Sequence, residues 1–185
     1  MTFIKTITLC TVLAVLTACG ASNRIAVQSP EITQNVRIGF ASVEVRDVSL
    51  PGYAAADEIT QQMPDGTLIA SDVLWGDTPA RAIGLELSRA LAELTNARIA
   101  PEPWPFEEDA AASLDIRFVD LVAGTDGVFR AAGQYFVGVY QGRERAGQFE
   151  LSVPYDVDGG PASIARARGQ IISDLAVYVA RNGLR

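Results

Sequence analysis

The sequence predicts an α+β fold: a mixed, mainly antiparallel sheet of about five strands, with two long helices packed on one face. Two segments, residues 79–95 and 161–182, each carry one apolar stripe at helical spacing. Residues 114–155 hold three strand-like segments separated by two Gly-containing turns, which is typical of an antiparallel meander. Because each helix has a single apolar stripe, we expect both to cover the same face of the sheet.

The predicted strands share alternating apolar residues or β-branched composition, and turn residues bound them. In the first of them the alternation slips near Ala41-Ser42, which suggests a bulge or a bend. The five are residues 36–45, 67–74, 114–118, 128–140 and 145–155, with residues 98–100 as a further short candidate.

Two long helices and one short helix are predicted. The first long helix begins at Thr78 and Pro79, a capping residue followed by one that suits the first helical position, and it ends near Asn96. The second ends at Gly183, where a C-terminal cap belongs. Residues 54–62 are expected to form the short helix. The buried stripes are Ile83, Leu87, Leu91 and Leu94, and then Ile164, Ile171, Leu175 and Val179.

Composition excludes several kinds of chemistry. The chain has no His, so imidazole catalysis and imidazole metal ligands are ruled out. Its two cysteines, Cys10 and Cys19, lie near the N-terminus, which leaves no disulfide or thiolate zinc site for the folded part. The net charge of -7 disfavours a nucleic-acid partner. No phosphate-binding loop or nucleophile-elbow pattern occurs. We therefore predict no catalytic residues, no cofactor and no metal site.

Residues 1–18 are predicted to be a lipoprotein signal peptide. Lys5 precedes an apolar run, residues 7–16, that is too short to span a bilayer. The segment Leu16-Thr17-Ala18-Cys19-Gly20 resembles the bacterial lipobox, whose Cys becomes the first mature residue and carries acyl chains. The resemblance implies lipid attachment at Cys19 and a membrane as partner. Gly20, where inner-membrane lipoproteins carry Asp, resembles an outer-membrane, periplasmic destination, with the inner membrane as the alternative.

The mature chain is predicted to contain one domain behind a linker. Residues 19–34 are polar and lack a clear period, so they are expected to form a flexible tether after the lipidated Cys19. Residues 35–185 are then a single periplasmic domain. The alternative for the tether is an N-terminal edge strand through Ile25 and Val27.

Two aromatic positions are candidates for partner binding. Trp75 lies between a predicted strand and a helix, and Trp104 lies between Pro103 and Pro105. Trp is favoured at binding hot spots. For each, the alternative is that the ring covers the edge of the core beneath a loop.

The order of motifs in the mature chain resembles the auxiliary lipoproteins of ABC-type transport systems, the PqiC or YmbA group. That family places a strand, a Pro-x-Tyr turn, a second strand, a Trp-containing junction and a helix in this order. The corresponding motifs here are Leu50-Pro51-Gly52-Tyr53, Asp72-Val73-Leu74-Trp75, Pro79 and the stripe that starts at Ile83. The resemblance covers residues 36–180 as architecture.

The resemblance implies a docking role and no catalysis. Such proteins are outer-membrane-anchored, work with a membrane-spanning MCE-type protein that carries lipids between membranes, and in some cases form rings. It makes Tyr53, Trp75 and Arg81 candidate partner-binding residues, beside Trp104, which is a candidate from its aromatic character alone. Two other functions stay open. A different envelope-assembly or small-ligand-binding lipoprotein predicts a deep apolar pocket between helices and sheet. A carboxylate-dependent hydrolase predicts a cleft with acids of raised pKa.

Overall fold

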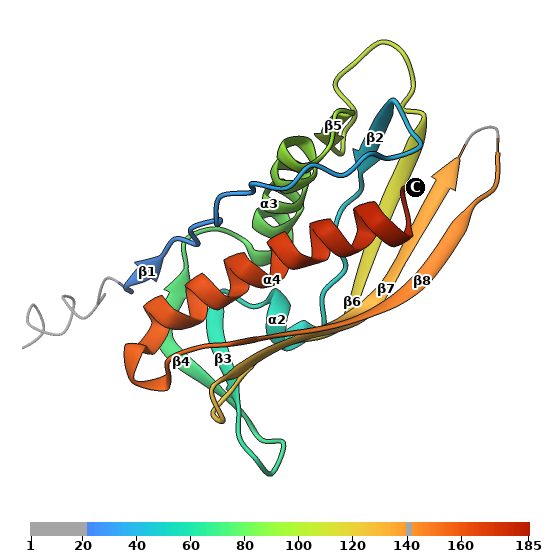
Figure 1. Cartoon of the computed structure of the whole chain (residues 1–185). Helices are drawn as coiled ribbons and strands as arrows, with labels where there is room; N and C mark the ends of the chain where they lie inside the picture. The colour runs from blue at the N-terminus through green and yellow to red at the C-terminus, as the bar shows by residue number, and fades with distance from the viewer. Residues whose placement is uncertain (1–21, 140–141) are drawn as a thin grey trace, which may run out of the picture.

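The computed structural model of the 185-residue chain describes residues 22–139 and 142–185 (Figure 1). The predicted signal peptide and Cys19 lie outside the described residues. The elements follow one another as β1 (Arg24–Ile25), β2 (Ser42–Val45), α2 (Gly52–Ala55), β3 (Glu58–Gln62), β4 (Leu68–Trp75), α3 (Pro79–Leu94), β5 (Arg98–Pro101), β6 (Ala112–Gly124), β7 (Val128–Val139), β8 (Arg145–Pro154), η2 (Val157–Gly159) and α4 (Gly160–Asn182).

The long strand β6 organises a mixed sheet. One of its edges pairs antiparallel with β7, which pairs with β8 in turn. Its other edge is shared by two parallel neighbours, β2 near its start and β3 at its end. Outside β2 lies β5, and outside β3 lie β4 and then β1. Within the described residues the sheet therefore has eight strands, more than the five or so predicted, and four of its seven pairings are parallel.

The prediction of a helix over residues 54–62 is wrong. A single turn, α2, ends at Ala55, and Glu58–Gln62 form strand β3. Ile59 is the only fully buried side chain of this polar strand, at 1 % exposure. The segment is held instead by backbone hydrogen bonds to β4 and β6. Pairing of this kind does not require apolar side chains, so the spacing of apolar residues does not predict it.

The first predicted strand is shorter than expected. Only residues 42–45 of the segment 36–45 form a strand, β2. The backbone before it pairs with the ends of the two long helices: the Val36 amide donates to the Leu94 carbonyl at 2.8 Å, and the Gly39 amide donates to the Leu184 carbonyl at 2.7 Å. The alternating side chains of this stretch still pack on the core, so the pattern was correct about burial and wrong about the ladder.

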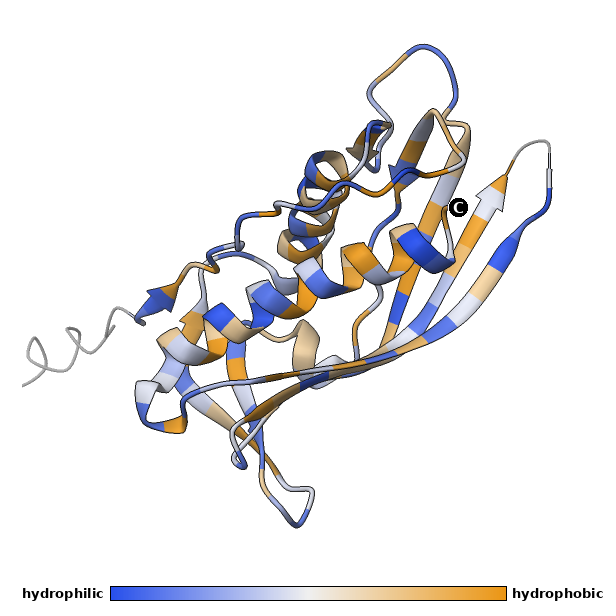
Figure 2. Cartoon of the chain, in the orientation of Figure 1, coloured by the Kyte–Doolittle hydropathy of each residue, from blue (hydrophilic) through white to orange (hydrophobic). Residues whose placement is uncertain are grey.

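Both long helices lie on the same side of the sheet, as predicted, and they also contact each other (Figure 1). Their predicted stripes are all buried in one core with the inward residues of the strands. Figure 2 shows apolar and polar residues alternating along the strands beneath them. In β6, Leu114 and Ile116 are buried, whereas Arg117 on the opposite face is exposed. Gly183 caps α4 as expected, through its amide and the Val179 carbonyl.

The N-terminal segment, residues 22–35, lies on the domain. Strand β1 pairs in parallel with the end of β4, so the edge-strand alternative holds for Ile25, while Val27 lies beyond the strand. Ile25, Val27 and Ile32 are partly buried against the core. None of the helices within residues 22–139 and 142–185 combines the length and apolar character needed to cross a bilayer.

Candidate functional site

Trp75 lies where four elements meet. It is the last residue of β4, and its amide donates to the Asp57 carbonyl at 2.7 Å. Its carbonyl accepts from Arg24 Nη1 of β1 at 2.9 Å. The guanidinium of Arg168 from α4 stacks over its ring, with the Arg Cζ atom 4.5 Å from the ring centroid. Only 7 % of Trp75 is exposed, and its backbone and ring together join β1, the residue that precedes β3, and α4.

A buried ion pair lies beside this ring. Arg168 Nη2 is 2.8 Å from Glu86 Oε1 of α3, and the two side chains are 2 % and 16 % exposed. Burial raises the pKa of Glu86, and the neighbouring Arg168 only partly opposes that shift. Burial likewise lowers the pKa of Arg168. Among the described residues, Glu86 Oε2 and Arg168 Nε have no hydrogen-bond partner. For both groups, burial therefore affects the pKa more than the charged partner does.

A hollow of about 290 Å³ opens above the pair, and we call it the Trp75 hollow. Its walls are the N-terminal segment on one side and the first half of α3 on the other. Leu85 on the α3 wall is 40 % exposed. The predicted site residue Arg81 does not line it, but forms an exposed ion pair with Asp77, which does. The lining residues are Ile25, Ala26, Val27, Trp75, Gly76, Asp77, Ala82, Leu85, Glu86 and Arg168.

Tyr53, in α2, meets Trp75 at a small cavity that is distinct from the Trp75 hollow. Its hydroxyl donates to Asp120 Oδ1 and accepts from the Leu121 amide at 3.3 Å, which ties α2 to β6. Burial, followed by the hydrogen bond to Asp120, raises the pKa of Tyr53 to about 12. Tyr53 and Trp75 both line a cavity of about 20 Å³, room for roughly one water molecule. The structure therefore brings these two predicted residues together.

Trp104 belongs to a separate surface in the loop after β5. Its ring nitrogen donates to the Glu108 carbonyl at 2.7 Å, and its ring meets the edge of Phe106 with centroids 4.9 Å apart. Phe106 is 43 % exposed, and the Arg98 guanidinium carbon lies 4.9 Å from its ring centroid. We call Trp104, Phe106 and Arg98 the Trp104 loop surface. It shares no residue with the Trp75 hollow.

The sequence reasoning missed the ion pair of Glu86 and Arg168. A usable signal was present, because Arg168 occupies the position between Ile164 and Ile171 on the apolar stripe of α4. A cation on a stripe of this kind requires a buried partner. The spacing identifies Arg168 as buried, but it does not identify Glu86 among the acids of the chain.

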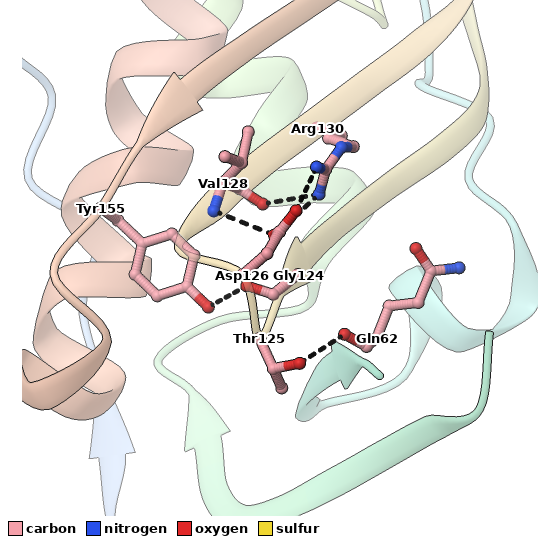
Figure 3. A network of polar contacts seen from close by, with 7 residues as sticks. All are labelled: Gln62, Gly124, Thr125, Asp126, Val128, Arg130 and Tyr155. Carbon is pink, nitrogen blue, oxygen red and sulfur yellow. Dashed lines mark hydrogen bonds and ion pairs between the residues drawn. The ribbon is translucent and has the colours of Figure 1, made fainter. Parts of the chain in front are cut away.

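The turns at another end of the sheet are joined by a polar network (Figure 3). The Tyr155 hydroxyl donates to the Gly124 carbonyl at 2.7 Å, and the Thr125 hydroxyl donates to the Gln62 carbonyl at 3.3 Å. Arg130 pairs with Asp126 at 2.5 Å and holds the pKa of that carboxyl below its usual range. These bonds fix the β6–β7 turn against the end of β3 and the residue that follows β8, and we assign them a structural role.

Two solved structures share this fold. The crystal structure of an uncharacterized protein is 17 % identical, covers 87 % of this chain and 98 % of its own, and gives a TM-score of 0.65. Protein XCC0632 from Xanthomonas campestris is 13 % identical, covers 86 % of this chain and 95 % of its own, and gives 0.64. At these identities the likeness concerns the fold alone. No curated protein matches the sequence.

The sequence itself matches one family over residues 25–180. That range runs from β1 to the last turns of α4, so it includes the Trp75 hollow and the Trp104 loop surface. The match confirms the resemblance drawn from the motifs around Tyr53 and Trp75. The chain therefore belongs to the family of ABC-type transport auxiliary lipoprotein components.

Proposed function

We propose that this chain is a periplasmic lipoprotein, anchored in the outer membrane through acylated Cys19, that serves as an accessory component of an MCE-containing ABC system moving lipids between membranes. It acts by docking onto the membrane-spanning MCE-type protein and by forming a homo-oligomeric ring. The observation that carries the proposal is the family match, which extends over nearly the whole described domain. The lipobox-like segment ending at Cys19 and Gly20 supports the anchor.

The docking role is assigned to the two aromatic surfaces. Beside the Trp75 hollow the exposed Arg81 offers a contact for the partner, and Trp75 lines the hollow, while Tyr53 meets Trp75 at the small cavity behind it. At the Trp104 loop surface, Phe106 is exposed and Trp104 supports it from the side. An exposed aromatic ring on a loop held by hydrogen bonds loses little conformational freedom on binding.

Co-purification tests the proposal. The full chain, tagged at its C-terminus, is expressed with the MCE-type protein of the same cell, extracted in mild detergent and captured. We expect the MCE-type protein to be retained and the captured chain to migrate as an oligomer. A strictly monomeric chain that retains no MCE-type protein contradicts the proposal.

Arg81 has a matched control on the same helix. Arg81 and Arg89 are both 65 % exposed, and each forms an ion pair with an acid four residues away. We expect Arg81→Ala to weaken capture, because it removes a cation beside the Trp75 hollow, and Arg89→Ala to leave capture unchanged. Equal effects of the two substitutions would remove Arg81 from the docking surface. Trp104→Ala is expected to weaken capture by loosening Phe106.

A further inference from the structure

The distance between the anchor and the folded domain is short. The carbonyl of Asn23 already accepts from the Leu74 amide at 2.8 Å, so the chain is fixed to the sheet from this residue onward. Four Cα-to-Cα steps separate Cys19 from Asn23, a span of at most about 14 Å. A flexible tether over residues 19–34 would instead allow up to about 50 Å between Cys19 and the domain. The sheet edge that begins at β1 is therefore held close to the lipid that carries Cys19.

That edge is only partly paired. Among the described residues, strand β1 pairs with β4 at Leu74 and Trp75 alone. In the described part of the chain no other strand pairs with this side of β4, so residues 68–72 form an open edge that continues from β1. We call Asn23–Ile25 together with residues 68–72 the β1/β4 edge. Figure 1 shows it as one continuous border of the sheet, ending at the β3–β4 turn.

Apolar side chains are exposed along this border. Leu68 is 41 % exposed and Ile69 is 51 % exposed, on consecutive residues of β4. Met63 in the adjoining turn and Leu85 on the helix beside β1 are 36 % and 40 % exposed. These four are among seven large apolar side chains so exposed in the described residues. An open edge with neighbouring apolar side chains is a surface that soluble proteins normally cover.

The charges at the edge are balanced or negative. Arg24 pairs with Asp57 at 3.2 Å, Arg81 pairs with Asp77, and Asp72 adds a further negative charge. Attraction to anionic headgroups is therefore not the driving force. The backbone groups of residues 68–72 that have no strand partner among the described residues need a polar environment, because unpaired amides are not tolerated in hydrocarbon. The interfacial layer of a bilayer meets both requirements, since it accepts apolar side chains while water and ester groups solvate the backbone.

From the short span, the open edge and its apolar side chains, we propose that the β1/β4 edge rests on the bilayer surface, with Leu68 and Ile69 at headgroup depth. This orientation rests on the proposed lipid anchor at Cys19. It directs the Trp104 loop surface away from the membrane, because that loop lies at the far end of the molecule (Figure 1). The occupant of the edge is lipid, rather than a second copy or a strand from another protein.

Single-site labelling tests the orientation on the lipidated mature chain. Once the signal peptide is removed, Cys19 is the only cysteine and its thiol is acylated, so an introduced Cys is the only labelling site. Ile69→Cys, Leu68→Cys and the control Phe106→Cys each receive the fluorophore NBD. The proteins are reconstituted into vesicles of phosphatidylethanolamine with a minority of phosphatidylglycerol, with or without lipid that bears a nitroxide near its carbonyl group. We expect quenching of the labels at 69 and 68 and none at 106.

The outcomes separate this inference from the proposed function. Palmitate incorporation and vesicle flotation are measured on the same preparations. If palmitate enters and the vesicles carry the protein, but the labels at 69 and 68 are not quenched, the orientation is wrong and the anchor stands. If the two labels are blue-shifted without quenching, protein covers the edge and lipid does not. If no palmitate enters, the anchor fails and the orientation fails with it.

Discussion

Replacing Arg168 by Met is the sharpest test of the buried pair beside Trp75. Met preserves much of the side-chain volume, so the main change is a Glu86 carboxylate, 16 % exposed, without its cation. Leaving one charge of a buried pair unpartnered costs about 3–5 kcal/mol. With a urea slope of about 2 kcal/mol per molar, the unfolding midpoint is expected to fall by about 2 M at pH 7.

The loss of unfolding free energy caused by Arg168→Met is expected to depend on pH. The pKa of Glu86 is already raised by burial in the folded chain, so the folded state binds this proton more tightly than the unfolded state does. Ionisation of Glu86 therefore lowers the free energy of unfolding as the pH rises from the ordinary pKa of Glu to the raised pKa of Glu86 in the folded chain. Without Arg168 the pKa of Glu86 rises further. The deficit relative to wild type is thus expected to be largest at neutral pH and to shrink on acidification.

The assay is urea unfolding followed by circular dichroism, on the mature chain with Ser in place of Cys19. Wild type and Arg168→Met are compared at pH 7 and below the ordinary pKa of Glu. The control Arg89→Met removes an exposed cation from the same helix pair and is expected to change the unfolding free energy by less than about 0.5 kcal/mol. A deficit of equal size at both pH values would refute the reasoning, since lost stacking on Trp75 would then explain it.

Two further predictions concern single contacts. Tyr53→Phe leaves the Leu121 amide without its acceptor, which is expected to cost about 1–3 kcal/mol in thermal unfolding and to speed hydrogen exchange at that amide; unchanged exchange would contradict this role. Gly169→Ala places a methyl group 2.5 Å from the Gln28 carbonyl oxygen, which must move away, so hydrogen exchange across the N-terminal segment should rise. In the control Gly84→Ala the new methyl group meets only a side-chain atom at 3.8 Å, and the substitution should stabilise α3 by about 0.5–1 kcal/mol. Protection of that segment in both variants would show that it does not depend on close contact with α4.

The sequence was sufficient for elements that bury a periodic face. The stripe from Ile83 to Leu94 fixed α3 within two residues at its C-terminal end, and the two Gly-containing turns located the meander of β6, β7 and β8. Such elements are specified by local spacing. The capping prediction was less accurate: Thr78 lies at the cap, but its side chain makes no capping bond, and the Asp77 side chain accepts from the Thr78 amide at 2.8 Å.

The elements that the sequence did not reveal are those held by distant partners. Strand β3 consists mostly of polar residues and exists because β4 and β6 pair with its two edges. Strand β1 contains two residues, and its ladder to Trp75 spans fifty positions of sequence. The pairing of Glu86 with Arg168 likewise depends on how α3 and α4 cross. In all three cases the missing information is long-range geometry, which composition and periodicity do not carry.

Strand β6 carries one extra, unpaired residue at its middle, and this residue limits where the fold can accept insertions and deletions. Val119 has no partner in β7, lies between the paired residues Phe118 and Asp120, and is 72 % exposed. The stretch of β6 before Val119 pairs with β2, and the stretch after it pairs with β3. Val119 therefore lies between two stretches that have different neighbours on the same edge of β6. Removing it would leave Asp120 opposite Ala132 in β7, so the side chains would keep their faces, but the bend and added twist of the bulge between the stretch that β2 pairs and the stretch that β3 pairs would be lost. Length variation is therefore tolerable in the turns, whereas the centre of β6 must keep its residue count.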